Sequence, residues 1–337
     1  MSTPTTARIY RPTPRNLALL ANVLARGGLV AAPTETVYGL AADARNATAC
    51  RAIFRAKGRP ANDPLIVHVN TLEQASEVAQ LNDAARKIAQ AFWPGPLTLV
   101  LPKQRGVPAI VTSGLPSVAV RMPAHPLFRE LITRSGCPLA APSANPFGYV
   151  SPTTAHHVRD GLGRQIAYIL DGGPAAIGVE STILDLRDPR RPAILRPGAV
   201  SREAMELVLS RNITAYARKA PAQTAAPAPG MLERHYSPRT PLSLVAKLTP
   251  AAIRNLPADQ AALLISRPPA ALCGPNVFWL AERTADLTSA AHHLFEQLRA
   301  LDTGGWMQIH AELAPGQSAL ALAINDRLLR AAAKRDE

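Results

Sequence analysis

Short apolar runs and amphipathic stretches alternate along most of the chain. Residues 29–33 and 97–101 have the apolar character of buried strands, whereas residues 15–26 and 47–57 repeat apolar positions at helical spacing. The same criteria predict strands at 65–67, 118–121, 138–141, 166–170, 181–186 and 193–196, and helices near 72–80, 83–92, 126–134, 153–160 and 201–210. Strands separated by helices of crossover length predict an α/β fold, a mixed twisted sheet with flanking helices.

The composition changes between residues 217 and 241, where Ala, Pro and Gly replace most large apolar residues. Such a stretch predicts an interdomain linker that its prolines partly extend. Beyond it, strands are expected at 242–246, 261–265, 277–280 and 307–310, and helices at 250–254, 284–301 and 319–333. We therefore predict a domain of residues 1–212, a linker of residues 213–241 and a smaller α/β domain of residues 242–337.

The length of 337 residues, with 47% of them hydrophobic, is typical of a globular protein with more than one domain. No apolar stretch reaches the roughly 18 residues of a membrane span. Residues 1–14 also lack the apolar core of a signal peptide. We therefore expect a cytoplasmic protein without a membrane partner.

The formal net charge of +13 favours anionic partners, because a field of this sign attracts nucleotides and RNA alike. The charge alone does not choose between them. The three cysteines, Cys50, Cys137 and Cys273, are far apart and lie among apolar residues. We expect buried reduced thiols and neither a disulfide framework nor a metal site.

A cationic turn is predicted after the helix at residues 47–57. Lys57 and Arg59 flank a glycine in the stretch KGRP, and the proline ends the helix. Cations at a helix C-terminus can simply stabilise its dipole, but two cations on an exposed turn can also hold an anion. The next strand carries His68, which alternates with Ile66 and would face solvent if it were only structural.

Polar side chains recur where the predicted strands end. The residues in these positions are Thr36, Arg121, Ser143, Ser181 and Arg196. The stretch PSANPFGYVSP adds Asn145 and Ser151 on a turn fixed by prolines. Hydroxyl and amide groups on such a turn suit phosphate oxygens, although Ser-Ala-Asn-Pro is also good turn chemistry. Because open α/β sheets bind ligands at strand ends, the recurrence predicts a binding site there.

The sequence offers no covalent nucleophile with a dedicated base. Ser143 lies outside any GxSxG elbow, and Cys137 sits in an apolar run. The histidine pairs at 156–157 and 292–293 diverge on a helix, so their spacing does not suit a metal. No P-loop and no GxGxxG motif occurs. Cations, hydroxyls and amides instead favour a site that positions phosphates and stabilises charge, as in nucleotidyl transfer.

Seven motifs in a fixed order carry a resemblance to a known family. They are PTETVYGLAAD, KGRPANDPLIVH, WPGPLTLVL, VAVRMPAHP, LAAPSANPFGYVSPT, GVESTILDL and ILRPG, and they fall within residues 15–210. The chain thereby resembles the threonylcarbamoyl-AMP synthases of the YrdC-like superfamily. The stretch PGMLERHYSPRTPL (229–242) resembles the linker of their two-domain form, and ALALAINDRLLRAA (319–332) resembles its C-terminal helix. The resemblance implies a YrdC-like first domain, a linker that covers the active site and a Rossmann-like second domain.

The resemblance also implies a reaction. L-Threonine, bicarbonate or carbon dioxide, and ATP would give L-threonylcarbamoyladenylate, pyrophosphate and water, with Mg²⁺ carried by the nucleotide. The product would feed a downstream threonylcarbamoyl-transferase machinery that makes threonylcarbamoyladenosine in tRNA. A direct contact with tRNA or double-stranded RNA stays open at this point.

Two groups of site residues follow from the motif positions. Lys57, Arg59, Ser143 and Asn145 would meet the phosphates as catalytic residues, and Asp63, Ser117, Ser151, Arg196 and Tyr236 would also help to hold ATP. Thr36, His68, Arg121, Ala141 and Ser181 would surround threonine or its carbamate, and no residue is assigned to a metal. Many relatives read DNPL where this chain reads NDPL, so either Asn62 or Asp63 could face the nucleotide.

Two alternatives belong to other classes. A double-stranded RNA-binding protein without catalysis would explain the charge and the cationic turn, but not Thr36, Ser143 and Ser181. The carbamoyl-adenylate-forming relative in hydrogenase maturation carries acylphosphatase and zinc-finger-like regions, which this sequence lacks. We therefore expect the synthase.

Overall fold

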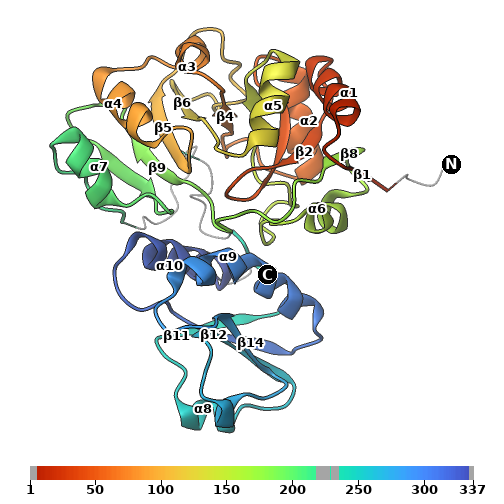
Figure 1. The fold of residues 1–337 in the computed structure, drawn as a ribbon, viewed down its shortest axis with the longest axis vertical. Coiled ribbons are helices and arrows are strands. Elements are labelled where there is room, and N and C mark those ends of the chain that lie inside the picture. Colours follow the sequence, from red (N-terminus) through yellow and green to blue (C-terminus); the bar gives the residue numbers. More distant parts are fainter. Residues whose placement is uncertain (1–5, 218–227, 229–234, 334–337) are drawn as a thin grey trace.

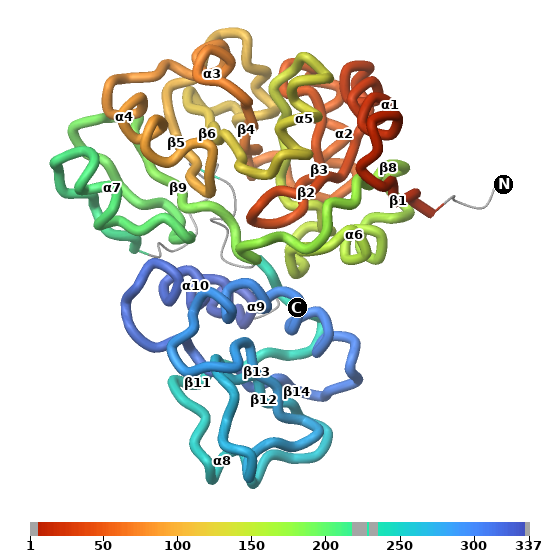
Figure 2. The backbone as a smooth tube through the Cα atoms, in the orientation of Figure 1, coloured from red at the N-terminus to blue at the C-terminus, as the bar shows by residue number. Residues whose placement is uncertain are grey.

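Two β-sheets organise the chain, and Figures 1 and 2 show them in separate units, one above the other. The computed structural model describes residues 6–217, 228 and 235–333. The upper unit contains a ten-stranded sheet and the lower unit a four-stranded sheet. The predicted α/β class, with a large mixed sheet and a smaller α/β unit after it, is confirmed.

The upper unit follows the predicted alternation of strands and helices. Its elements are β1 (Arg8–Tyr10), α1 (Pro14–Ala25), β2 (Val30–Pro33), β3 (Tyr38–Asp43), α2 (Ala47–Lys57), β4 (Ile66–His68), α3 (Leu72–Val78), α4 (Asp83–Phe92), β5 (Leu97–Pro102), β6 (Ser117–Arg121), α5 (Pro126–Ser135), β7 (Leu139–Ala140), α6 (Ala155–Leu162), β8 (Tyr168–Leu170), β9 (Thr182–Asp185), β10 (Ala193–Arg196) and α7 (Arg202–Leu209). The strand order is β1-β8-β2-β3-β7-β4-β6-β5-β9-β10.

The large sheet is mixed and has helices on both faces. Pairs such as β4 with β6 and β5 with β9 are parallel, whereas β2 with β3 and β5 with β6 are antiparallel. Helices α1 and α5 pack against each other and cover one face, with Leu20 and Phe128 fully buried there. Ile53 of α2 and Ile88 of α4 belong to the cluster that covers the other face. The central strands are therefore covered on both faces, which explains why most of their residues are apolar.

Two strands of the large sheet were absent from the prediction. The first, β3, follows a turn after Pro33 and contains Gly39 and several alanines, which favour strands weakly. Its neighbours β2 and β7 supply the pairing that the local sequence does not predict. The second, β1, has only three residues and lies at the edge of the sheet. In both cases tertiary context outweighs local preference.

The lower unit is an all-parallel sheet with helices on both sides. Its elements are β11 (Leu242–Val245), α8 (Pro250–Arg254), β12 (Gln260–Ser266), the 3₁₀ helix η1 (Ala270–Leu272), β13 (Val277–Ala281), α9 (Leu287–Thr303), β14 (Gln308–Glu312) and α10 (Ala319–Ala331). The strand order is β11-β14-β12-β13, and every pair is parallel. Helices α9 and α10 lie on the side that faces the upper unit, and α8 lies on the far side (Figure 1).

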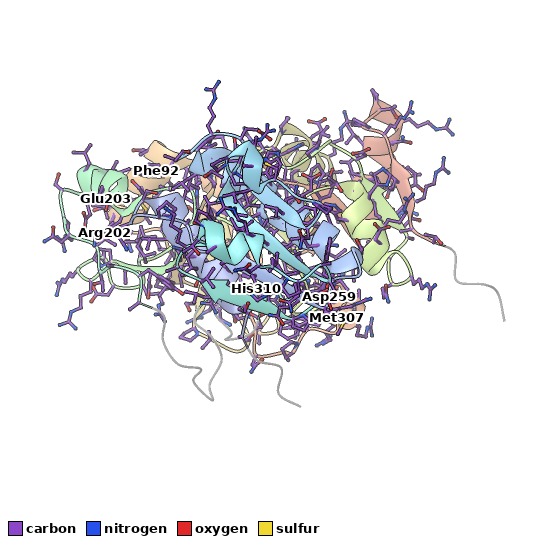
Figure 3. All side chains as sticks on the ribbon, turned by 90° about the horizontal axis from the view of Figure 1, so that it is seen from below. Phe92, Arg202, Glu203, Asp259, Met307 and His310 are labelled. Atoms are coloured by element: carbon purple, nitrogen blue, oxygen red, sulfur yellow. The ribbon has the colours of Figure 1, made fainter. Side chains whose placement is uncertain are left out.

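The outer side of the lower unit exposes its strand ends. Seen from below, Figure 3 shows Asp259, Met307 and His310 close together there. The Met307 amide donates to the Asp259 carbonyl over 2.8 Å, and 68% of Met307 is exposed.

No helix among the described residues is long and apolar enough to cross a membrane.

The expectation of three buried cysteines is wrong for one of them. Cys50 and Cys137 are buried, but Cys273 is exposed. Cys273 directly follows η1, in a short turn before β13 that the sheet does not cover. The apolar residues around it in sequence therefore do not indicate burial in the fold.

The two units approach each other closely at Gly178. This residue has a φ of +82°, and a side chain added there would place Cβ 2.4 Å from the carbonyl oxygen of His292 in α9. Real Cβ atoms do not approach backbone that closely. Only glycine allows both this conformation and this contact.

We predict that Gly178→Ala destabilises the protein by about 1–3 kcal/mol more than Gly173→Ala, because only the first adds an overpacked contact. Gly173 is a matched control, since its φ is +79° and an added Cβ would meet nothing within 4 Å. Urea unfolding of both variants measures the difference. Equal free energies of unfolding would show that the contact with α9 is not tight.

Candidate functional site

A small cavity lies where neighbouring strands of the large sheet end. It is bordered by the turn between β2 and β3, the ends of β4, β6 and β10, the segment after β7 and the residues before β9. His235 and Tyr236 also border it. The space that remains among these side chains is about 50 Å³. The strand ends that the sequence singled out therefore do meet.

Arg121 occupies one wall of the cavity and is almost fully buried. Its Nη1 donates to Thr36 Oγ1 over 2.9 Å, and its Nε donates to the carbonyl of Gly95 over 3.2 Å. Its Nη2 lies 2.7 Å from Glu35 Oε1. Burial raises the pKa of Glu35, but the charge of Arg121 and its hydrogen bond outweigh that effect and hold the pKa below its usual value. These three contacts hold the guanidinium in one orientation.

His68 lies beside Arg121, because β4 and β6 pair in register at these two residues. It is buried, so a solvent-facing role for this histidine is wrong. Its ring lies 5.1 Å from the ring of Phe128, between centroids. Burial, and then the charge of Arg121, lower the pKa of His68 to about 3, so the imidazole is neutral at neutral pH.

Ser181 and Arg196 form the opposite wall. Arg196 donates from Nε to the Ser181 carbonyl over 3.1 Å and from Nη2 to Ser181 Oγ over 3.1 Å. The same hydroxyl lies 2.8 Å from Thr98 Oγ1 of β5. A bulge in β10 next to Arg196 and the antiparallel pairing with β9 place the two side chains together. A hydroxyl and a guanidinium group, both on buried residues, thus border the cavity together.

The expected exposed turn at Lys57 and Arg59 is wrong, because both side chains are buried. Lys57 Nζ donates to the carbonyls of Ser143 over 2.6 Å and of Asn145 over 2.5 Å. Burial, and then the charge of Arg59, lower the pKa of Lys57. The left-handed Gly58, with a φ of +63°, ends α2 and lets the chain turn inward. The turn is covered because the segment after β7 folds over it.

Arg59 forms a buried ion pair with Asp63. Its Nη2 lies 2.9 Å from Asp63 Oδ2, and its Nε and Nη2 donate to the carbonyls of Asp63 and Pro64. Asp63 is fully buried, whereas the neighbouring Asn62 is exposed. Of these two residues, Asp63 is therefore the one on the side of the site.

His235 and Tyr236 fill much of the space between the walls. Tyr236 is fully buried, stacks on Phe295 of α9 with ring centroids 5.3 Å apart, and meets the His235 ring edge-on at 4.1 Å. Its φ of +63° is unusual for a residue other than glycine. Burial lowers the pKa of His235, and the charges of Arg59 and Lys57 lower it further. Met231 and Leu232, which the sequence analysis placed near this linker segment, lie outside the described residues.

Several buried polar atoms around the cavity have no hydrogen-bond partner among the described residues. They include His68 Nδ1, His235 Nδ1 and Tyr236 Oη. Buried polar groups without a partner are rare, because each loses its water without compensation. Their concentration here indicates a site that a polar ligand completes.

The structure separates the predicted site residues into two sets. The residues that border the cavity are Thr36, Arg59, His68, Arg121, Ala141, Ser143, Ser181, Arg196 and Tyr236. The others, Lys57, Asp63, Ser117, Asn145 and Ser151, are buried but do not border it. Asn145 Nδ2 donates to the carbonyls of Pro146 and Tyr149, so it holds the turn that carries Ser143.

Sequence reasoning missed three polar residues that border the cavity: Thr34, Glu180 and His235. Each is a close sequence neighbour of a residue that it named. The motifs PTET, GVEST and HY therefore contained the signal, but only the fold shows which way each side chain points. Among the described residues, no group of three or more His, Cys, Asp or Glu side chains could hold a metal.

Comparison with known proteins covers both units. The family model described as telomere recombination matches residues 22–198, and the model of the threonylcarbamoyl-AMP synthase C-terminal domain matches residues 200–333. The threonylcarbamoyl-AMP synthase of Pyrococcus abyssi is 40% identical over 95% of this chain and 94% of its own length. That of Bacillus subtilis is 40% identical over 95% of this chain and 93% of its own length. The crystal structure of P. abyssi Sua5 complexed with L-threonine superposes with a TM-score of 0.87 at 39% identity, and the match covers 97% of this chain and 98% of that one.

We predict that Arg59→Ala lowers the free energy of unfolding by about 3–5 kcal/mol, because it removes the buried ion pair between Arg59 and the Asp63 carboxylate. Arg134→Ala is the control. Arg134 makes an exposed ion pair with Glu130 at 2.6 Å, and losing such a pair costs less than about 1 kcal/mol. Urea unfolding distinguishes the two, and similar losses would mean that the Arg59 pair is no stronger than a surface pair.

Proposed function

Because the chain belongs to the threonylcarbamoyl-AMP synthase family, we propose that its cavity joins L-threonine, bicarbonate and ATP into L-threonylcarbamoyladenylate. The observation that carries this assignment is the meeting of two kinds of groups in one water-poor cavity. Guanidinium and hydroxyl groups suited to a phosphate border the same cavity as an arginine suited to a carboxylate. The product supplies the threonylcarbamoyl group of threonylcarbamoyladenosine in tRNA.

The reaction is a nucleotidyl transfer. The amine of threonine first takes up carbon dioxide, supplied as bicarbonate with loss of water, and becomes a carbamate. A carbamate oxygen then forms a bond to the α-phosphorus of ATP, and the bond from that phosphorus to the bridging oxygen of the β-phosphate breaks. Pyrophosphate leaves with the electron pair. The protein contributes alignment of the two substrates and stabilisation of the charge that develops on the phosphates.

Threonine or its carbamate lies between Arg121, Thr36 and Ser181 in this proposal, with His68 and the backbone at Ala141 around it. The contacts of Arg121 to Thr36, Gly95 and Glu35 orient its guanidinium. A guanidinium that is already oriented loses little entropy when it binds a carboxylate. Neutral His68 can accept or donate a hydrogen bond at the carbamate without adding charge.

ATP lies on the side of Arg59, Ser143, Arg196 and Tyr236. Lys57 and Asn145 support the segment that carries Ser143, because Lys57 donates to the carbonyls of Ser143 and Asn145. The remaining buried residues assigned to the nucleotide are Asp63, Ser117 and Ser151. Mg²⁺ enters on the polyphosphate of ATP and adds to the positive charge around the leaving pyrophosphate.

The linker controls access to the cavity in this proposal. Ligand pockets typically enclose roughly 300–1,000 Å³, and the space left beside Tyr236 is about 50 Å³. The segment at His235 and Tyr236 must therefore withdraw when ATP enters. It then covers the nucleotide and keeps water from the carbamate and the mixed anhydride.

Residues 1–212 form the catalytic domain in this proposal, residues 213–241 the covering linker, and residues 242–337 a domain that supports both. The protein acts in the cytoplasm and passes its product to a threonylcarbamoyl-transferase machinery. The net charge of +13 is also compatible with direct contact to tRNA. RNA binding that depends on salt, without turnover of ATP, would instead favour the double-stranded RNA-binding alternative.

Incubation of the purified protein with ATP, threonine and labelled bicarbonate should release pyrophosphate and label an adenylate. In Arg121→Lys, we expect the KM for threonine to rise at least about tenfold, because an ammonium cannot form the bidentate pair. The KM for ATP should change far less. Absence of a labelled adenylate from the unmodified protein would refute the function, and equal changes in both KM values would refute the role of Arg121.

In Tyr236→Phe, the ring keeps its packing on Phe295 and loses only the hydroxyl, which has no partner among the described residues. If that hydroxyl meets ATP, its removal should raise the KM for ATP about fivefold, the worth of one hydrogen bond. The KM for threonine and the melting temperature should stay unchanged. An unchanged KM for ATP would reduce Tyr236 to a packing residue.

A further inference from the structure

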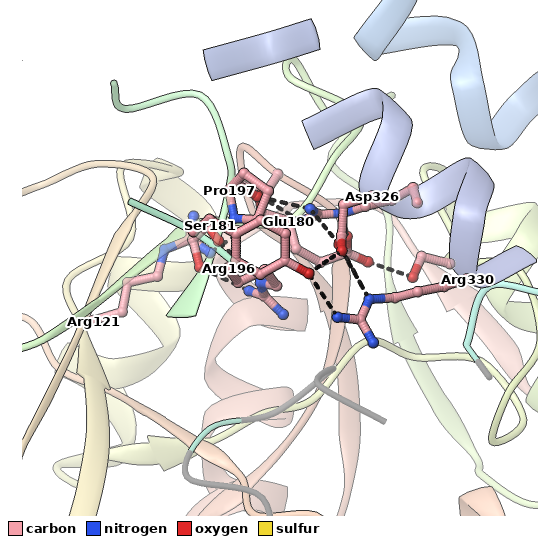
Figure 4. A network of polar contacts seen from close by, with 11 residues as sticks. Arg121, Glu180, Ser181, Arg196, Pro197, Asp326 and Arg330 are labelled. Carbon is pink, nitrogen blue, oxygen red and sulfur yellow. Dashed lines mark hydrogen bonds and ion pairs between the residues drawn. The ribbon is translucent and has the colours of Figure 1, made fainter. Parts of the chain in front are cut away.

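Arg327 belongs to α10 of the lower unit and is fully buried. Its side chain contacts residues of the upper unit. Figure 4 shows the polar network around it, in which Glu180, Pro197, Asp326 and Arg330 are labelled. Its Nε donates to Glu180 Oε2 over 3.0 Å, and its Nη1 donates to the Pro197 carbonyl over 2.7 Å. Its Nη2 also donates to the Glu180 carbonyl over 3.3 Å. One guanidinium thus binds two separate segments of the upper unit.

Both segments carry a residue of the cavity wall. Glu180 directly precedes Ser181, and Pro197 directly follows Arg196. The bonds between Arg196 and Ser181 join the same segments on the cavity side. Arg327 therefore joins the same two segments a second time, one residue before Ser181 and one residue after Arg196.

The two segments are also packed too closely to tolerate much displacement. A side chain at Gly198 would place Cβ 2.2 Å from the Thr182 amide nitrogen. The other carboxylate oxygen of Glu180 accepts a bond from Ser151 Oγ over 2.6 Å, so Glu180 is held from two sides. Loss of the Arg327 bonds would leave a buried carboxylate and a buried carbonyl without these donors, and the segments would have to shift to reach water.

Arg327 also contacts the linker. Its Cζ lies 5.7 Å from the centre of the Tyr236 ring, in the geometry of a cation–π contact. The guanidinium itself is held within its own helix, since Asp326 Oδ2 lies 3.3 Å from its Nη1. Asp326 in turn accepts from Arg330 Nε over 3.1 Å and from Tyr216 Oη over 2.5 Å. Asp326 does not border the cavity, so Arg327 is also held by a contact outside it.

We propose that Arg327 is a positioning residue through which the second domain sets the geometry of the cavity wall. By holding Glu180 and Pro197, it fixes the Ser181 hydroxyl against threonine and the Arg196 guanidinium against the nucleotide. This role rests on the proposed function, because it acts through two residues assigned there. It gives the lower unit a part in substrate binding without placing any of its residues in contact with substrate.

The test compares Arg327→Met with Tyr149→Phe. Tyr149 donates to Asp302 Oδ2 over 2.7 Å, so its substitution also removes a hydrogen bond between the two units, but away from the cavity wall. We expect the KM values for ATP and threonine to rise at least about tenfold in Arg327→Met and to stay within about twofold in Tyr149→Phe. Arg327→Lys should resemble Arg327→Met, because an ammonium cannot join the two segments as a planar fork does.

A merely structural role would reduce the amount of folded enzyme, which lowers kcat and leaves both KM values unchanged. Unchanged KM values in folded Arg327→Met would therefore overturn the proposal. If that variant does not fold, the double variant Arg327→Met with Glu180→Gln replaces it. Both charges of the ion pair are then removed, so no carboxylate is left unpaired at position 180. Unchanged KM values in the double variant would overturn the proposal equally.

Amide hydrogen exchange provides a readout that is independent of catalysis. Peptides covering residues 179–200 should exchange at least about tenfold faster in Arg327→Met than in Tyr149→Phe, because the held segments open more often. Equal exchange would overturn the role of Arg327 even if the enzyme were active. Conversely, an unmodified protein that makes no adenylate would refute the proposed function and leave the exchange result as the measure of this inference.

Discussion

A buried guanidinium is stable only if nearby acceptors replace the water it has lost, and this requirement shapes both the site and the contact between the two units. The arginines concerned are Arg59, Arg121, Arg196, Arg299 and Arg327, all of them buried. Each donates to at least one backbone carbonyl in a segment between two secondary-structure elements. Every such bond orients the arginine and immobilises the segment at the same time. The walls of the cavity are rigid because the charges that line them could not otherwise be buried.

The same requirement shapes the contact between the upper and lower units. Arg299 of α9 donates to the carbonyls of Val150 and Ser151, and Arg327 of α10 donates to those of Glu180 and Pro197. Backbone carbonyls are acceptors whose position depends on the fold and not on a rotamer. Such contacts therefore specify one relative placement of the two units.

The sequence predicts the elements that local pattern determines. Helix α8 has the predicted bounds of 250–254, because Thr249 caps it and Pro250 begins it. Strand β3 could not be predicted, since its alanines and glycine acquire strand geometry only through β2 and β7. Elements of the first kind depend on neighbours in sequence, whereas elements of the second kind depend on neighbours in space.

The residues of the candidate site also fall into two groups, those that local sequence predicts and those that only the fold brings together. That Thr36 and Ser181 lie at strand ends follows from pattern alone, and the structure brings both to the cavity. The burial of Lys57 was not predictable, because the carbonyls that accept from it belong to the segment around Ser143, far along the chain. Nor does any local signal indicate that Arg327, in the last helix, reaches Glu180. Contacts between residues so far apart in the sequence form only in the folded chain.

The close approach at Gly178 shows how tightly α9 packs on the upper unit. The His292 carbonyl occupies the space that a Cβ at this position would need. Sliding of α9 along the upper unit would have to break the bonds that Arg299 and Arg327 donate to that unit. In the proposed function, the segment around His235 and Tyr236 withdraws from the cavity, and that movement would leave both sets of bonds intact.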